Sequence, residues 1–438
     1  MNRSERLARR LEALDRARPL QLVGRVTEVT GLAARAALAG ARLGDWVELR
    51  TPGRPGLLAE VIAVHGEQAT LMPLGELRGI GPDSQVVPHG RPFELQAGRQ
   101  LLGRVLDGIG RPLDGKPLPA GLQPWPVDRP APHPLQRRPI TRPLPLGIRA
   151  VDGLLTIGEG QRVGIFAGSG VGKSTLLGQM VRAGAADAAV VCLVGERGRE
   201  VREFVEATLG AEGLARSVVV VATSDAPARL RVAAAQVATA LAEWFADVEG
   251  RQVLLLLDSL TRLARAQREI GIAAGEPPGR QGYPPSVFAL LASLLERAGN
   301  RARGGVTALY TVLVAGGDLD EPIADEVRGI LDGHLVLDRR LANRAHWPAI
   351  DVLGSVSRLM PAISGPEQRA AAARVRTLLA DYERQRDLIA LGAYQAGSDR
   401  RTDLAIQRID AIEGFLRQGA QERVELAETL ARLQELAA

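Results

Sequence analysis

The chain has 438 residues, of which 46% are hydrophobic, and a formal net charge of +5 at pH 7. This length predicts two or three domains with a sizeable core, and a single cysteine, Cys192, excludes an internal disulfide framework. No apolar run approaches the roughly 18–20 residues of a membrane-spanning helix. The charged N-terminal segment is unlike a signal peptide. We therefore expect a cytosolic protein.

Arginine supplies almost all of the positive charge, because Lys116 and Lys173 are the only lysines among 55 basic residues. Abundant alanine, arginine, leucine and glycine beside few aromatic residues indicate a compositional bias of the whole genome. We therefore interpret the excess of positive charge as part of a solvated surface, and we expect no nucleic-acid partner.

Residues 2–18 are predicted to form a short amphipathic helix. Leu7, Leu11 and Leu14 recur at helical spacing among arginines, which gives one narrow apolar stripe. Such a helix, placed ahead of any domain, either frays or docks on a partner, and we favour docking.

Residues 19–95 contain short β-prone runs separated by glycine and proline, and several such strands at close spacing predict a small β-barrel. The clearest runs cover residues 21–29, 46–50, 57–64 and 68–72. A barrel that binds single-stranded nucleic acid usually offers aromatic stacking platforms. Because Trp46 and Phe93 are the only aromatic residues here, a structural or assembly role is favoured.

The remainder of the chain divides into three further parts. Residues 96–145 are rich in proline, which predicts an extended connector with little regular structure. Over residues 146–362 strands alternate with helices, which predicts an α/β fold with a parallel sheet. Expected strands cover residues 163–166, 189–194, 217–222, 253–258 and 306–314. Residues 363–438 are predicted to form a C-terminal helical domain.

The segment 167–175 has the sequence Ala-Gly-Ser-Gly-Val-Gly-Lys-Ser-Thr and stands between an apolar strand and a predicted helix. This is the context of a phosphate-binding P-loop, in which glycines let several backbone N–H groups point at one anion. Lys173 would reach the phosphates, and the Ser174 hydroxyl would bind Mg²⁺. The predicted nucleotide-binding residues are Gly168, Ser169, Gly170, Val171, Gly172, Lys173, Ser174 and Thr175.

Two carboxylates follow the neighbouring expected strands. Asp258 ends an apolar strand after the P-loop, which is the position of a Walker B residue that holds Mg²⁺. Glu196 follows the strand in between, and ligands of open parallel sheets gather at that edge. Glu196 would polarise the water that attacks the γ-phosphate, although a solvated charged loop is the alternative.

Four segments resemble the signatures of the type III secretion ATPases, flagellar and injectisome, which are related to the catalytic subunit of the rotary ATP synthase. They cover residues 195–204, 258–269, 275–278 together with 282–288, and 330–334. The resemblance extends from about Gly24 into the C-terminal helices, and this family often has alanine where Ala167 stands. It implies a RecA-like P-loop ATPase core with an N-terminal β-barrel and a C-terminal helical domain.

The resemblance also implies roles for individual residues. Lys173, Ser174 and Asp258 keep the roles given above, and Glu196 matches the family's catalytic glutamate. Arg197 and Arg262 match arginines of the active site, and Arg358 matches an arginine finger that is delivered to the neighbouring subunit. Trp347 stands where relatives have a tyrosine that packs on adenine. A second departure is Ala315 with Gly317, where relatives have acidic residues.

The implied function is Mg²⁺-dependent ATP hydrolysis by a cytosolic homohexamer at the inner-membrane base of a secretion apparatus. Implied partners are a stator-like regulator at the N-terminal helix, a central stalk, chaperone–effector complexes and the export gate, with peripheral membrane association. Segments 159–162, 222–225 and 394–399 favour the injectisome branch over flagellar export. A hexameric RNA translocase and a non-catalytic ring subunit are the alternatives, and Glu196 opposes the latter because non-catalytic subunits carry glutamine there.

Overall fold

The computed structural model describes residues 22–438, so the helix predicted over residues 2–18 lies outside the described residues. The described chain forms two compact units. The first extends to Phe93 and includes Ile272–Glu276, and the second comprises Glu94–Gly271 and Pro277–Ala438. The domain boundaries predicted at 95, 145 and 362 stay predictions.

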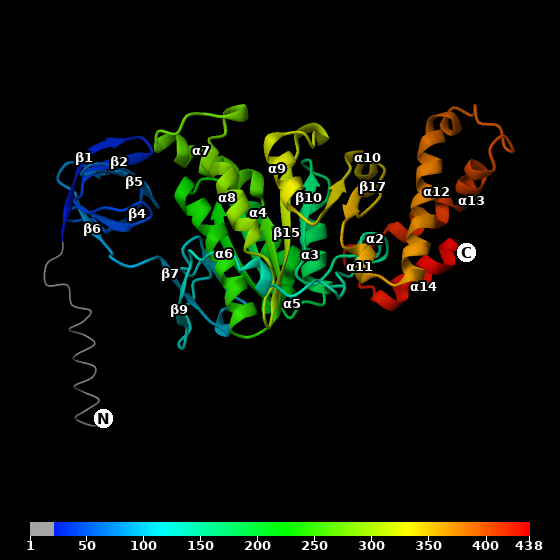
Figure 1. Cartoon of the computed structure of the whole chain (residues 1–438), viewed down its shortest axis with the longest axis horizontal. Coiled ribbons are helices and arrows are strands. Elements are labelled where there is room, and N and C mark those ends of the chain that lie inside the picture. The colour runs from blue at the N-terminus through cyan, green and yellow to red at the C-terminus, as the bar shows by residue number, and fades with distance from the viewer. Residues whose placement is uncertain (1–21) are drawn as a thin grey trace, which may run out of the picture. The chain divides into compact units, whose positions relative to one another are not determined.

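The first unit is built on a closed barrel of antiparallel strands in the order β1-β2-β5-β4-β3-β6 (Figure 1). The strands are β1 (Gly24–Thr30), β2 (Ala33–Ala37), β3 (Trp46–Arg50), β4 (Leu57–His65), β5 (Gln68–Pro73) and β6 (Gln85–Pro88). The predicted barrel is thus confirmed. The sequence did not indicate β2, because its Ala-Ala-Arg-Ala-Ala run lacks the β-branched and aromatic residues that favour strands.

The two aromatic residues of this unit stack on each other. The rings of Trp46 and Phe93 have centroids 4.3 Å apart, and Trp46 is buried. Trp46 therefore packs inside the unit. The structural or assembly role of the barrel stays a prediction.

The proline-rich segment, residues 96–145, takes part in more β-strand pairing than the sequence indicates. Strand β7 (Glu94–Ala97) pairs with β9 (Gln123–Pro126), and β8 (Val105–Asp107) joins the large sheet beside β12. Short 3-10 turns cover Arg99–Leu101 and Pro134–Gln136. The prolines of β9 are tolerated because a two-stranded ribbon has only edge strands. These pairings join segments far apart in the chain, so local sequence patterns did not predict them.

A sheet in the order β17-β16-β10-β15-β13-β11-β12-β8 organises the second unit, with β14 paired to β15. Its remaining strands are β10 (Arg162–Ala167), β11 (Ala188–Glu196), β12 (Ser217–Thr223), β13 (Gln252–Asp258), β14 (Gly299–Asn300), β15 (Gly305–Leu313), β16 (Gly333–Leu337) and β17 (Ile350–Ser357). The five predicted strands are present. Pairing is parallel except at β14 and β17, which run antiparallel to their neighbours.

Helices cover the sheet, and α6 packs against β11, β12 and β13. The helices of this part are α2 (Arg149–Leu154), α3 (Lys173–Ala183), α4 (Gly198–Glu203), α5 (Gly210–Ala215), α6 (Ala228–Asp247), α7 (Leu260–Ala273), α8 (Pro285–Glu296), α9 (Pro322–Ile330) and α10 (Arg339–Asn343), with a π-helical turn at Phe204–Leu209. Helix on both faces explains why all nine residues of β11 are buried. The carboxyl ends of β10, β11 and β13 meet at one edge, which we call the phosphate edge.

The C-terminal part consists of α11 (Met360–Ile363), α12 (Pro366–Ala390), α13 (Arg400–Leu416) and α14 (Leu426–Ala437). Its core is continuous with that of the sheet, since Phe415 and Leu433 pack in the same cluster as Val151. A Cβ at Gly153 would lie 3.3 Å from the Phe415 ring, so a glycine allows α2 to approach these helices closely. Within residues 22–438, we find no helix with the length and apolar character to span a membrane.

Candidate functional site: an ATPase centre at the phosphate edge

The loop from β10 to α3 has the backbone shape that its glycines permit. Gly170 and Gly172 have φ values of 74° and 75°, a left-handed region that glycine adopts readily. Ser169, Gly170, Ser174 and Thr175 are exposed, whereas Val171 is buried and anchors the turn. A Cβ on Gly172 would lie 2.7 Å from the Trp347 ring, so this position also requires glycine for space. The loop therefore presents backbone to an incoming anion.

Lys173, in the first turn of α3, contacts both predicted carboxylates. Its Nζ forms an ion pair with Asp258 and lies 3.5 Å from Oε1 of Glu196. The side chains of Lys173 and Glu196 are 12% and 11% exposed, and that of Asp258 is 3% exposed. In this water-poor setting charge interactions are strong. Residues separated by up to 85 positions thus form one cluster beside the P-loop.

Glu196 lies among charges of both signs. Arg262 Nη1 is 2.7 Å from Glu196 Oε2 and also donates to the carbonyl of Gly195 at 2.5 Å. Burial raises the pKa of Glu196, and a hydrogen bond with Glu200 and the nearby Asp258 act in the same direction, while Lys173 and Arg262 oppose them. The same hydrogen bond lowers the pKa of Glu200. A raised carboxyl pKa brings this group closer to the neutral range in which a general base works best.

Asp258 is held by a residue that sequence reasoning missed. Thr311 Oγ1 donates to Asp258 Oδ1 at 2.6 Å, from the neighbouring strand β15. A threonine inside an apolar strand gives no motif, so only the pairing of β13 with β15 reveals this partner. Among the described residues no cluster of three or more His, Cys, Asp or Glu side chains forms a metal site. Mg²⁺ typically needs only one or two protein carboxylates beside substrate phosphates and water.

Two predicted residues lie away from this cluster. Arg197 is 75% exposed in its side chain and pairs with Glu200 at 3.2 Å. Arg358 directly follows β17, and the last residue of β17, Ser357, pairs with Gly333 at the start of β16. The P-loop begins at the other end of β16, where Ala167 pairs with Leu337. Four residues of strand correspond to about 13 Å. Arg358 is therefore exposed at the opposite edge of the sheet from its own P-loop.

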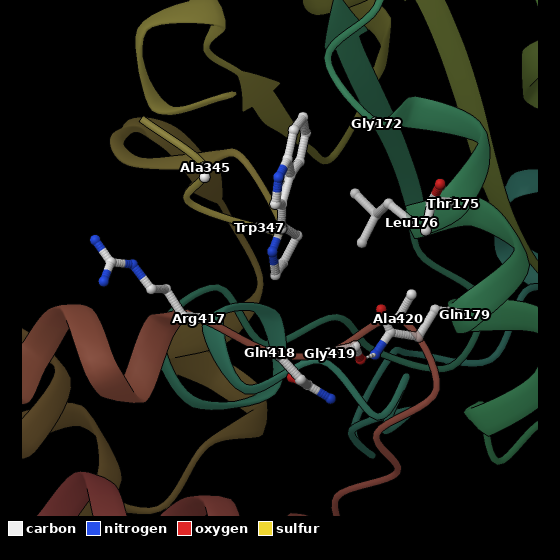
Figure 2. Close-up of a pocket in the computed structure, with 11 residues that line it drawn as sticks. Gly172, Thr175, Leu176, Gln179, Ala345, Trp347, Arg417, Gln418, Gly419 and Ala420 are labelled. Atoms are coloured by element: carbon white, nitrogen blue, oxygen red, sulfur yellow. Dashed lines mark hydrogen bonds between the residues drawn. The ribbon is translucent and has the colours of Figure 1, made fainter. Parts of the chain in front are cut away.

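A pocket of about 550 Å³ adjoins α3 (Figure 2). Trp347, 40% exposed, forms one wall, and the loop of residues 417–420 forms another. We call this the base pocket. Its remaining lining is Gly172, Thr175, Leu176, Gln179, Ala345 and Pro348. The position of Trp347, next to the first turn of α3, is suited to a flat ring attached to phosphates held by the loop.

The loop 417–420 was not predicted as part of the site. Arg149, 3% exposed in its side chain, donates to the Phe415 carbonyl at 2.7 Å and also contacts Glu422 and the Arg417 carbonyl. Gln179 on α3 donates to the carbonyl of Gly419 at 3.1 Å. These contacts fix the segment between α13 and α14 against α2 and the P-loop helix α3. No local signal marks them, because each partner lies more than 230 residues away in the chain.

A strand–P-loop–helix unit with Lys173, Asp258 and Glu196 at one sheet edge defines a P-loop ATPase. Comparisons with known protein families identify the family within this class. Residues 147–357 match the nucleotide-binding domain of the ATP synthase alpha/beta family, and residues 364–435 match the T3SS EscN ATPase C-terminal domain. The chain belongs to the type III secretion ATPase family, which includes the flagellar export ATPases, and it is an ATPase that acts in protein secretion.

Relatives of both branches are similar over almost the whole chain. The flagellum-specific ATP synthase of Bacillus subtilis is 50% identical over 94% of each chain. The type 3 secretion system ATPase of Xanthomonas euvesicatoria is 52% identical over 90% of this chain and 89% of the relative. The assembled ATPase EscN from enteropathogenic E. coli matches with a TM-score of 0.90 and 44% identity over 95% of this chain and 100% of EscN. A second EscN structure, in complex with its central stalk EscO, matches with a TM-score of 0.88 and 44% identity over 95% of this chain and 100% of that chain.

Proposed function

We propose that the chain forms a homohexamer with ATP sites shared between neighbouring subunits, and that hydrolysis releases chaperones from export substrates and helps to unfold them. The observation that carries the proposal is the contact of Lys173 with both Asp258 and Glu196 at the phosphate edge. A lysine held by two carboxylates beside an exposed glycine loop is ready to exchange one of them for a phosphate.

The oxygen donors present suit Mg²⁺. Ser174 is exposed on the first turn of α3, and the Asp258 carboxylate forms an ion pair with the adjacent Lys173. These two residues would hold the ion, which, when bound with ATP, neutralises charge on the phosphate oxygens. Lys173 and the N–H groups of residues 168–175 bind and orient the phosphates.

Glu196 orients the attacking water and accepts its proton. Its raised pKa favours that role, and Arg262 at 2.7 Å keeps the carboxylate in place. Arg197, exposed beside this group, is proposed to act once a neighbouring subunit covers the edge. Trp347 would stack on the adenine ring in the base pocket.

Arg358 would complete the site of the next subunit. It lies too far from its own P-loop along the sheet, and the hydrogen bond found for its guanidinium within residues 22–438 is a long one, 3.4 Å to the Arg328 carbonyl. An arginine supplied in trans stabilises the charge of the transition state only after the ring closes. The assembled state of EscN, 44% identical, supports self-association of the chain, and we propose that the assembly is a hexamer.

The partners and location follow from the family. The complex of EscN with EscO supports a central stalk as partner. We further propose a stator-like regulator for residues 2–18, chaperone–effector complexes and the export gate for the C-terminal helices, and a cytoplasmic location with peripheral association at the inner membrane. We favour the injectisome branch from the segments named above, and flagellar export is the second candidate, because identities to the two branches are similar at 52% and 50%.

The test mixes two inactive variants, Glu196→Gln and Arg358→Ala. Each alone should lose about 10²–10⁴-fold in kcat. In a mixed ring, about one interface in four pairs an intact Glu196 with an intact Arg358. We therefore expect turnover to reappear on mixing and to depend on protein concentration. Mixtures that stay inactive, or turnover per subunit that is independent of concentration, would contradict shared sites. Stimulation by added RNA would instead indicate a translocase.

A further inference from the structure

Arg339 contacts the P-loop from a direction that no motif indicates. It is the first residue of α10 and follows β16, the parallel neighbour of β10, so it lies at the phosphate edge. Its Nη2 donates to the carbonyl of Ser169 at 2.9 Å. The same nitrogen lies 3.5 Å from the position that a Cβ would take on Gly168. The guanidinium thus contacts the loop at Gly168 and Ser169.

The bonded carbonyl determines the direction of a neighbouring N–H. In a planar trans peptide, the C=O of one residue and the N–H of the next point in opposite directions. The Ser169 carbonyl shares its peptide plane with the N–H of Gly170. Gly170 has a φ of 74° and nothing within 4 Å of where its Cβ would be, so this peptide can rotate with little steric resistance. A bond that holds the carbonyl outward therefore holds the Gly170 N–H toward the other side of the loop.

We propose that Arg339 is a positioning residue for the ATP phosphates: by holding the Ser169 carbonyl, it keeps the Gly170 N–H directed into the phosphate cradle before the nucleotide arrives. The inference rests on the proposed phosphate-binding role of the loop. Without the bond, ordering of this peptide would be added to the cost of binding. We expect the loss of one such contact to weaken ATP affinity about three- to tenfold.

Arg340 offers a matched control. It is one position further along α10, is also exposed, and its guanidinium pairs with Asp338 at 2.8 Å. The experiment compares Arg339→Ala, Arg339→Lys and Arg340→Ala with the unchanged full chain. Binding of ATP and of adenosine, which lacks phosphates, is measured at about 0.05 M and about 0.5 M salt. Hydrogen exchange of the peptide that covers residues 168–172 is measured without nucleotide.

The expected result is specific to phosphates and insensitive to salt. Arg339→Ala should weaken ATP binding by the same factor at both salt concentrations, leave adenosine binding unchanged and accelerate exchange in the loop, while Arg339→Lys, which keeps a donor, recovers part of the affinity. Arg340→Ala should match the unchanged chain. A loss that disappears at high salt would overturn the proposal, because Arg339 would then act only as a charge. An equal loss for adenosine, or no loss, would overturn it as well.

Failure of the proposed function gives a different result. A Lys173→Ala variant is included, and if the unchanged chain binds ATP no better than this variant, the phosphate site itself is wrong. If the unchanged chain binds ATP and Lys173→Ala does not, the site stands whatever Arg339→Ala does.

Discussion

The phosphate edge and the base pocket are neighbours on α3, yet they are built in opposite ways. At the phosphate edge, charged groups from the ends of β11 and β13 contact Lys173 in a nearly buried cluster. The base pocket has a volume of about 550 Å³, a partly exposed ring in Trp347 and a wall from the C-terminal part. Under the proposed function, we expect the phosphate edge to recognise charge through fixed geometry. We expect the base pocket to recognise a flat ring through surfaces from three segments of the chain.

This difference predicts how each part responds to change. A cluster of buried charges tolerates little alteration, since removal of one partner leaves the others without compensation. A pocket lined by apolar surface loses affinity in proportion to the contact removed. Substitutions at the phosphate edge should therefore abolish turnover, whereas substitutions in the base pocket should change the concentration of ATP that is needed.

The largest effect is expected for Lys173→Ala. The variant loses the cation that pairs with Asp258 and Glu196, so both ATP binding and kcat should fall, with kcat/KM at least about 10³-fold lower. The matched control is Lys116→Ala, the only other lysine, which is exposed. Steady-state ATP hydrolysis measures both. If Lys173→Ala raises KM but leaves kcat unchanged, the phosphate edge responds to substitution as the base pocket does. The contrast between the two regions would then be wrong.

A smaller effect is expected for Trp347→Ala. Loss of a stacking ring typically costs about 1–3 kcal/mol per base, so KM for ATP should rise about five- to 150-fold while kcat changes little. Trp347→Tyr keeps an aromatic face and should stay within about threefold of the unchanged chain. Both constants come from the same hydrolysis assay. A fall in kcat with constant KM would show that Trp347 acts on the chemistry.

The pH dependence of turnover should sharpen the view of the phosphate edge. Arg262 lowers the pKa of Glu196, against burial, which raises it. Glu196 must be ionised to accept a proton, so Arg262→Gln should move the acidic limb of the kcat profile to higher pH. The rate at saturating ATP, measured as a function of pH, gives the midpoint of that limb for each protein. A midpoint that moves to lower pH would contradict the role of Glu196.

The smallest effect concerns the support of the base pocket. Burial raises the pKa of the Asp152 carboxyl to about 7, although it accepts hydrogen bonds from the Leu146 and Gly147 amides, and Gln418 donates to the Gly147 carbonyl. A carboxyl with a raised folded-state pKa stabilises the fold below its unfolded value, near 3.8, and this contribution is lost as pH rises to about 7. The melting temperature should therefore fall more between about pH 5 and about pH 8 in the unchanged chain than in Asp152→Asn. Equal changes in both proteins would argue that Asp152 does not titrate there.

The sequence by itself determined the phosphate edge. P-loop recognition depends on backbone shape, which glycines and one lysine encode within nine consecutive positions, and Asp258 and Glu196 follow apolar strands whose parallel order brings their ends together. The barrel and the five central strands were also predictable, because hydrophobic runs and turn residues are local features.

Only the tertiary structure decided which distant side chains complete the site. Thr311 on Asp258, Arg339 on the Ser169 carbonyl, and Arg149 on the loop that closes the base pocket carry no pattern of their own. Their roles arise from contacts across 53 to 268 positions in the chain, where strand order and helix packing set the distance. Local sequence records the preferences of single segments, whereas these contacts depend on how whole segments pack together.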